Sequence, residues 1–337
     1  MSKPFQEGRL LRTPIRDLGL TIEGSPLEAV LAKFQEEVEA KGIRRWKPSF
    51  YLSDEWGVPF GTISIAIPFY LARPELEEAH AERAAYLEGE GRPDLLRYLR
   101  HEMGHAVNYA YRLYEQEEWT RHFGSIRKPY VEEYVPVPFS RRFVRNLPGW
   151  YAQKHPDEDW AETFAVWMTP GLDWRAAYAD WPEALGKLEY CDRAMASCNA
   201  REPLVKATER DVDVSEIPVS LEQYCGEPEE PDEGWPPGLD DALRAIFEDF
   251  GAPDDAGARR PASELIQRLK RDLVKNVYRW TGHFPEPARD LVQHLADRAK
   301  ALDQVYPADR EGAVTVAITT LITTLAMNRV CRGNYVP

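Results

Sequence analysis

The segment "LRHEMGH", residues 99–105, carries two histidines and a glutamate with the spacing of a metal site. His101 and His105 are four residues apart, so on a helix both imidazoles lie on one face and can reach the same ion. Glu102 follows the first histidine and lies to the side of that face, where it can hold a water molecule. The spacing predicts a zinc site; chance co-occurrence on a helical face is the alternative.

The residues around this motif predict a helix over 93–116. Leu96 and Leu99 form an apolar stripe that continues through Met103. Gly104 weakens a helix by about 1 kcal/mol relative to alanine. In return, it lets a neighbouring element approach closely.

A catalytic zinc needs a third protein ligand and keeps its fourth position for water. The segment "HPDEDWAETFAVWM", 155–168, predicts a second helix on which Glu158 and Glu162 share one face. One carboxylate can bind the metal while the other accepts the outer N–H of a ligating histidine. The alternative is that these acids only stabilise the positive end of the helix.

Together, "HEMGH" and "YAQKHPDEDWAETFAVW" resemble the gluzincin class of zinc peptidases. More closely, they resemble the bacterial family described as putative zinc-binding metallopeptidases, and we expect the resemblance to extend to the C-terminal "TTLAMNRVCRGNYVP". Lethal-factor-type toxin proteases share a smaller version of the pattern. Matched to that version, Glu158 becomes the ligand, Glu162 the supporting acid and Tyr151 the preceding tyrosine. The spacing from His105 to Glu158 is longer here, so Glu162 stays open as the third ligand.

The resemblance implies one Zn²⁺ per chain, bound by His101, His105 and Glu158. Glu102 would then act as general base in the hydrolysis of a peptide bond. Tyr151 is the expected donor to the oxyanion, unless it only packs under the helix. Arg141 and Arg142 are further candidates for that donor. His155 is expected to support the ligands, to face the substrate or to begin the helix.

Peptidases of this class bind substrate as an added strand along a sheet edge. The segment "TISIAIPFYLA", 62–72, is the expected edge, and residues 119–150 are expected to be an ordered loop that forms one wall of the cleft. The basic residues of this loop hint at acidic or C-terminal substrate groups, with a solvated loop as the alternative. Its aromatic residues are expected to pack the loop down.

The composition limits the partners of the chain. It has 337 residues and a net charge of −14, which argues against sequence-independent binding to nucleic acid or to an anionic membrane. Four scattered cysteines predict buried free thiols rather than a disulfide framework. The N-terminus lacks the apolar run of a signal peptide, so we expect a cytoplasmic protein. The resemblance implies that its partner is a peptide or protein substrate.

Changes of hydrophobic period predict an α+β fold, with a mixed domain over 1–224 and an all-helical domain over 239–337. The resemblance implies that the first domain is a zincin-like catalytic domain. Between them, 225–238 is an acidic, Pro/Gly-rich linker, or else a long surface loop. Strands are expected within 49–56 and 61–72. Helices are expected over 25–42, 74–88, 93–116, 156–169, 181–200, 239–250, 261–281, 287–304 and 309–330. The uncharged stretch 312–328 is expected to be buried against protein rather than to cross a membrane.

Two other functions fit the same motifs. A protein-binding or regulatory module could keep the zinc for stability and use its C-terminal helices as the working surface. A zinc hydrolase of a non-peptide amide would share the metal chemistry. The first alternative predicts that Glu102→Gln changes nothing measurable, whereas both hydrolases predict loss of turnover.

Overall fold

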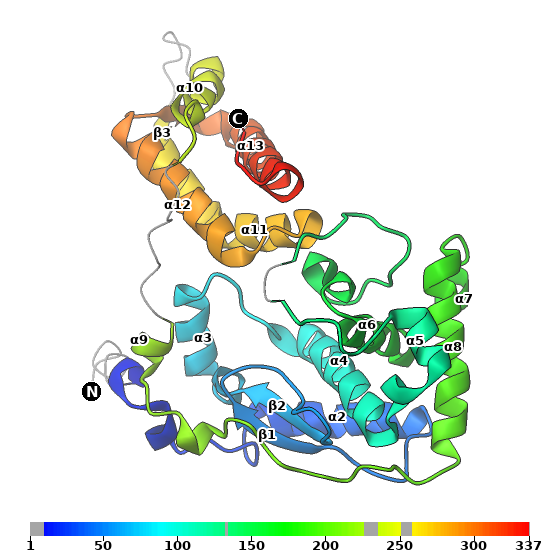
Figure 1. Cartoon of the computed structure of the whole chain (residues 1–337). Coiled ribbons are helices and arrows are strands. Elements are labelled where there is room, and N and C mark those ends of the chain that lie inside the picture. Colours follow the sequence, from blue (N-terminus) through cyan, green and yellow to red (C-terminus); the bar gives the residue numbers. More distant parts are fainter. Residues whose placement is uncertain (1–9, 132–133, 226–234, 251–257, 337) are drawn as a thin grey trace. The chain divides into compact units, whose positions relative to one another are not determined.

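The computed structural model describes residues 10–131, 134–225, 235–250 and 258–336 (Figure 1). The chain divides into two compact units, Met1–Glu227 and Pro228–Pro337. Each unit buries its own hydrophobic core, so each is described by itself. Most of the predicted linker, residues 226–234, lies outside the described residues.

The first unit is mainly helical, with one small sheet. The mixture of helices with small sheets agrees with the predicted α+β class. Its elements are η1 (Ile15–Leu18), α2 (Pro26–Ala40), β1 (Ser49–Ser53), β2 (Ser64–Pro68), η2 (Phe69–Ala72), α3 (Pro74–Arg83), α4 (Gly91–Tyr111), η3 (Leu113–Glu115), α5 (Glu117–Phe123), η4 (Pro148–Gln153), α6 (Pro156–Met168), α7 (Trp174–Ala177), α8 (Pro182–Asn199), η5 (Val214–Glu216) and α9 (Leu221–Tyr224).

The sheet pairs β1 with β2 in parallel, in register from Ser49 opposite Ser64 to Ser53 opposite Pro68. On the other side of β2, Ala66 N–H donates to the carbonyl of Gly57, which forms an antiparallel bridge. All five residues of β2 are buried. The prediction that β2 is the exposed edge is therefore wrong: the segment around Gly57 covers it and becomes the outer edge.

Helices α4 and α6 cross closely at Gly104, as the glycine suggested. A Cβ atom there would lie 2.7 Å from the Cα of Ala161, and Trp160 Nε1–H donates to the Gly104 carbonyl at 2.7 Å. Helix α4 ends earlier than predicted, at Tyr111, because Arg112 adopts the left-handed conformation (φ 49°). Residues 119–123, predicted as the start of a loop, belong to the short helix α5 (Glu117–Phe123).

The second unit contains α10 (Leu239–Phe250), α11 (Ala262–Thr281), α12 (Pro285–Ala301) and α13 (Glu311–Arg332). It also contains the antiparallel ladder of β3 (Arg259–Pro261) and β4 (Val305–Pro307), followed by η6 (Ala308–Arg310). The prediction of an all-helical region is therefore wrong in this detail. Three-residue strands that end in proline are too short to show a strand period.

Helix α13 is the one described helix that is long and apolar enough to span a membrane by length and composition. Its apolar face packs into the second core through Val314, Ile318, Ile322 and Leu325. The opposite face is open, and Val316 is 67% exposed. The helix is thus amphipathic and packed against protein on one side, as predicted, but it is not buried all round.

Candidate metal centre

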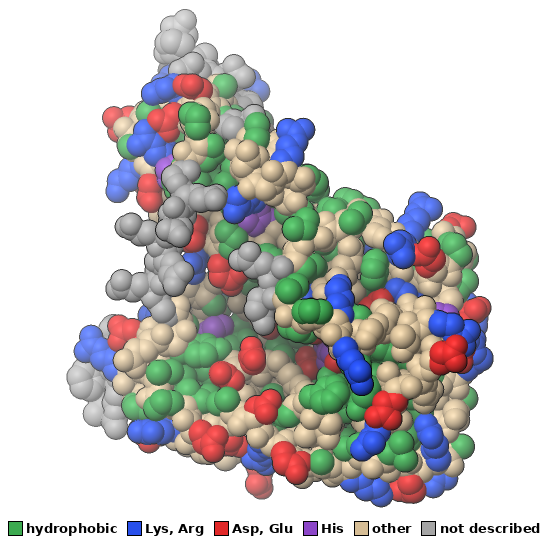
Figure 2. Space-filling view, in the orientation of Figure 1, with side chains coloured by type: hydrophobic (Ala, Val, Ile, Leu, Met, Phe, Trp, Pro, Cys, Tyr) green, Lys and Arg blue, Asp and Glu red, His purple; other side chains and the backbone are tan. Residues whose placement is uncertain are grey.

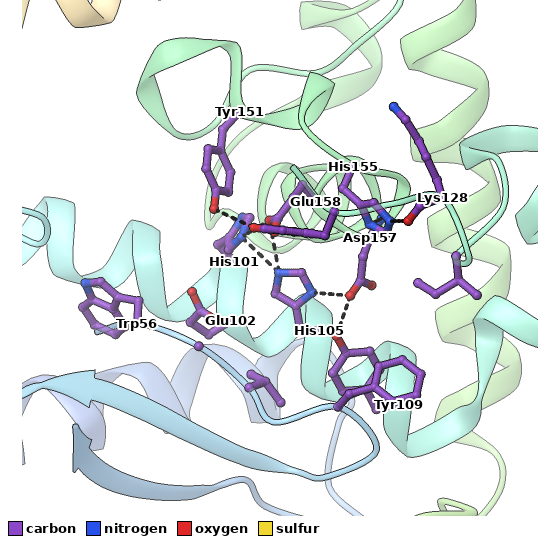
Figure 3. A pocket seen from close by; sticks show the side chains of 15 residues that line it. Trp56, His101, Glu102, His105, Tyr109, Lys128, Tyr151, His155, Asp157 and Glu158 are labelled. Atoms are coloured by element: carbon purple, nitrogen blue, oxygen red, sulfur yellow. Dashed lines mark hydrogen bonds and ion pairs between the residues drawn. The ribbon is translucent and has the colours of Figure 1, made fainter. Parts of the chain in front are cut away.

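Two helices bring three ligand atoms together in the first unit. His101 and His105 project from α4, and Glu158 projects from the first turn of α6 (Figure 3). The two Nε2 atoms are 3.2 Å apart, and Glu158 Oε2 lies 3.0 Å from that of His101 and 3.3 Å from that of His105. Among the described residues, this trio is the group of side chains placed to hold one metal ion.

The triangle has the chemistry and the size that Zn²⁺ requires. Two imidazole nitrogens and one carboxylate oxygen are common ligands of catalytic zinc. Ligands about 2.0 Å from a tetrahedral ion lie about 3.3 Å from one another, close to the separations found here. The donor set therefore fits a single zinc ion with one position left for solvent.

Glu162 lies behind His101, on its outer nitrogen. Its Oε1 is 2.9 Å from His101 Nδ1, so it is placed to support the histidine and not to bind the metal. The backbone N–H groups of Asn146 and Leu147 donate to Glu162 Oε2 at 3.1 and 2.8 Å. Glu162 thereby ties the loop before η4 to the imidazole, and the geometry favours Glu158 over Glu162 as the third ligand.

Asp157 plays the matching part for His105, and sequence reasoning missed it. Its Oδ2 lies 3.1 Å from His105 Nδ1. Asn108 Nδ2 donates to Asp157 Oδ1 at 2.7 Å, and the hydroxyl of Tyr109 donates to Oδ2 at 2.5 Å. Asp157 adjoins Glu158 in the sequence, but the crossing of α4 and α6 that pairs it with His105 leaves no spacing signal.

The histidines and the carboxylates of this cluster each favour the charged form of the other. Burial alone would lower the pKa of His101, but Glu158 and Glu162 outweigh it and raise the pKa to about 9. Burial would raise the pKa of Glu158, but His105 and His101 hold that pKa well below its usual value. Glu158 is therefore ionised at neutral pH, as a metal ligand must be.

Glu102 faces a cavity of about 340 Å³ in front of the trio. Its side chain is only 4% exposed, and it makes no hydrogen bond or ion pair with the described residues. Burial raises the pKa of its carboxyl. In Figure 3, it lies between Trp56 and His105, beside the ligands and not among them. A buried carboxylate without a partner is placed to accept a proton in this cavity.

Tyr151 also lines the cavity, with its ring 5.5 Å from that of His101 in an edge-on arrangement. The turn before it is unusual, because Trp150 has a left-handed backbone (φ 61°). The guanidinium of Arg145 lies over the ring of Trp150 at 4.5 Å and over that of Trp181 at 4.6 Å. This stacking holds the strained turn that directs Tyr151 toward the trio.

The two arginines proposed as further oxyanion donors do not fit that role. Neither Arg141 nor Arg142 lines the cavity. Arg142 Nε instead pairs with Glu183 on α8 at 2.6 Å. The sequence could not exclude them, because the path of the loop has no periodic signature.

His155 begins α6, which is one of the three roles left open for it. Its Nδ1 accepts from the backbone N–H of Asp157 at 3.1 Å, and its Nε2 donates to the Lys128 carbonyl at 2.9 Å. Both ring nitrogens are thus engaged in holding α6 and the loop together. Ile126, Lys128 and Tyr130 from that loop line the cavity, as expected of a cleft wall.

The visible face of the first unit has no patch of one charge. Figure 2 shows acidic and basic side chains interspersed over its lower part, with apolar side chains between them.

Comparison with known proteins gives one family and no individual relative. No curated protein and no solved structure matches the chain. The model of a family described as "Putative zinc-binding metallo-peptidase" matches residues 60–178, which contain all the ligands of the trio. The match does not reach the C-terminal segment to which the resemblance was expected to extend. Over residues 60–178, the match confirms the predicted resemblance to a putative zinc metallopeptidase family.

Proposed function

We propose that the protein is a cytoplasmic zinc-dependent peptidase whose single Zn²⁺ is held by His101, His105 and Glu158. The observation that carries the proposal is the triangle of three ligand atoms, 3.0–3.3 Å apart, beside a buried carboxylate that has no hydrogen-bond or ion-pair partner among the described residues. The family match supports it, because peptidases of such a family act on peptides or proteins.

The bound zinc would supply a Lewis acid that acidifies a water molecule and polarises a carbonyl. In the proposed reaction, Glu102 accepts a proton from the attacking water on its carboxylate and then donates it to the leaving amine. The hydroxyl of Tyr151 donates to the carbonyl oxygen as negative charge develops there. Glu162 and Asp157 hold the two imidazoles in the orientation that presents Nε2.

The segment Trp56–Val58 is the proposed substrate edge. Gly57 turns its carbonyl toward β2, and the backbone groups of Trp56 and Val58 form no hydrogen bond with the described residues. Because backbone groups alternate in direction along an extended chain, those of Trp56 and Val58 face away from β2. All three residues line the cavity, so an extended peptide can pair with them in front of Glu102.

The open side of the site argues against a purely stabilising zinc. Structural zinc sites are closed by four protein ligands, whereas three converge here in the part of the chain that the structure describes. A cavity of about 340 Å³ in front of the trio has room for a substrate group. These features favour hydrolysis over the zinc-stabilised module.

The test measures zinc content and cleavage of a peptide library by the wild type and by Glu102→Gln. We expect one zinc per chain in both proteins. Cleavage should fall at least about 100-fold in the variant, because the proton acceptor is lost. Equal cleavage by both proteins, or a wild type that binds no zinc, would contradict the proposal.

A further inference from the structure

Tyr130 has contacts that neither loop packing nor the mechanism above explains. Its side chain is 49% exposed, so it adds little to the core. Nevertheless, its hydroxyl reaches inward and donates to Oε1 of Glu158 at 2.8 Å, although Glu158 itself is only 5% exposed. The expectation that the aromatic residues of this loop only pack it down is therefore wrong for Tyr130.

The two oxygens of Glu158 are thereby divided between two tasks. Oε2 faces the Nε2 atoms of His101 and His105, while Oε1 accepts the hydrogen bond from Tyr130. A carboxylate can bind a metal through one oxygen or through both. A hydrogen bond to Oε1 opposes the second mode, because it directs that oxygen toward the hydroxyl.

The ring of Tyr130 is held in place from two sides. The ammonium of Lys154 lies 4.4 Å from the ring centroid, and the imidazole of His155 lies 5.4 Å from it. Lys154 is itself only 8% exposed, and its ammonium also lies 5.5 Å from the ring of Tyr151. The hydroxyl is thus directed at Glu158 by neighbours that are themselves fixed.

The same hydroxyl contacts the proposed oxyanion donor. Tyr130 and Tyr151 have their oxygens 3.4 Å apart. Since Tyr130 gives its proton to Glu158, Tyr151 is the donor in this pair. Tyr130 therefore touches both the third ligand and the tyrosine beside it.

We propose that Tyr130 is a positioning residue that restricts Glu158 to one-oxygen binding and so keeps the fourth position of the metal open for solvent. This inference rests on the proposed zinc site. A catalytic zinc site needs that open position, whereas a structural site has none. The proposed role of Tyr130 is therefore a role in hydrolysis and not in stabilising the fold. The residue acts through Glu158 and does not touch the reacting atoms.

The test uses the full chain loaded with Co²⁺, whose visible absorption is stronger in four-coordinate than in five-coordinate sites. Wild type is compared with Tyr130→Phe and with the control Tyr134→Phe. Tyr134 lies in the same loop, and its hydroxyl donates to the Gly149 carbonyl at 2.7 Å. Tyr130→Ala, which also removes the ring, guards against a compensating movement of phenylalanine.

We expect both Tyr130 variants to lose absorption intensity, since Oε1 becomes free to bind the metal, while Tyr134→Phe matches the wild type. With zinc, kcat of Tyr130→Phe should fall about 10–100-fold with little change in KM. An unchanged spectrum in Tyr130→Phe, or an equal loss in Tyr134→Phe, would overturn the inference. If the wild type binds Co²⁺ and cleaves peptides through Glu102, such a result refutes the role of Tyr130 alone. A wild type without metal uptake refutes both proposals.

Discussion

Each imidazole of the candidate centre has a carboxylate on its outer nitrogen. Glu162 lies 2.9 Å from Nδ1 of His101, and Asp157 lies 3.1 Å from Nδ1 of His105. Such partners fix the tautomer and the ring orientation of a metal ligand and increase its basicity. At the scale of single residues, the orientation of the two histidines therefore depends on Glu162 and Asp157.

Replacing Asp157 with asparagine removes the charge behind His105 with little change in size. Zinc affinity should fall about 10–100-fold, because the imidazole becomes a weaker and less well oriented ligand. Competition with a chromophoric chelator measures this change. The control is Asp173→Asn. The Asp173 carboxylate accepts from the backbone N–H of Ala176 at the start of α7 and does not line the cavity, so this change should leave the zinc affinity unchanged. Equal affinities of wild type and Asp157→Asn would contradict the assigned role.

Some of these residues could be predicted from spacing, and others could not. His101, Glu102 and His105 share one helix, so the helical period places them relative to one another. The period left Glu158 and Glu162 equivalent, since both lie on one face of α6. Their difference arises from the crossing of α4 and α6, and the contacts of Asp157 and Tyr130 depend on that crossing and on the loop conformation.

At the scale of elements, the site depends on how closely α4 and α6 approach each other. The contact occurs at Gly104, one residue before His105, where even a single added carbon would meet the backbone of Ala161. The same contact brings the indole of Trp160 within hydrogen-bonding distance of the Gly104 carbonyl. The glycine therefore sets the distance from the two histidines to Glu158.

Gly104→Ala should destabilise the protein by about 1–3 kcal/mol, because the two helices must separate. It should also weaken zinc binding, since Glu158 moves away with α6. Denaturant unfolding and zinc titration measure the two effects.

The matched control is Gly186→Ala in α8. The nearest neighbouring atom to its added Cβ is 4.0 Å away, on His122. There, the helix propensity of alanine should raise stability by roughly 0.5–1 kcal/mol. If both alanine substitutions changed the stability equally, the close contact at Gly104 would not require a glycine.

Two features of the helices and strands could not be predicted from the sequence pattern. An abundance of β-branched and aromatic residues indicated β1 and β2, but not that the segment at Gly57 covers β2. That cover is one isolated bridge, which leaves no pattern along the chain. Similarly, nothing in the apolar period marks Arg112, whose left-handed backbone ends α4. Local conformation decides both features.

At the scale of the whole molecule, each unit has its own core, and each contains a buried histidine whose pKa is lowered to about 4. In the second unit, His283 is 4% exposed, and its Nε2 lies 2.8 Å from the Tyr335 hydroxyl. Burial lowers its pKa to about 4. In the first unit, burial likewise lowers the pKa of His80 to about 4, and its ring stacks on Tyr70.

As the pH falls, the second unit should therefore lose stability before the carboxylates become protonated. An unfolded histidine binds a proton near pH 6.5, whereas folded His283 resists it until about pH 4, so stability falls as the pH drops between these values. At pH 5, the loss from His283 amounts to roughly 2 kcal/mol. Calorimetry at pH 7 and pH 5 measures it. His283→Gln should show a smaller decrease, and an unchanged pH dependence would exclude His283 as the cause.

The most direct measurement of the central claim is zinc K-edge X-ray absorption of the zinc-loaded protein. Binding by His101, His105, Glu158 and one water predicts four nitrogen or oxygen ligands at about 2.0–2.1 Å, two of them with the scattering pattern of imidazole. A sulfur ligand at about 2.3 Å, or a shell without imidazole, would contradict the account.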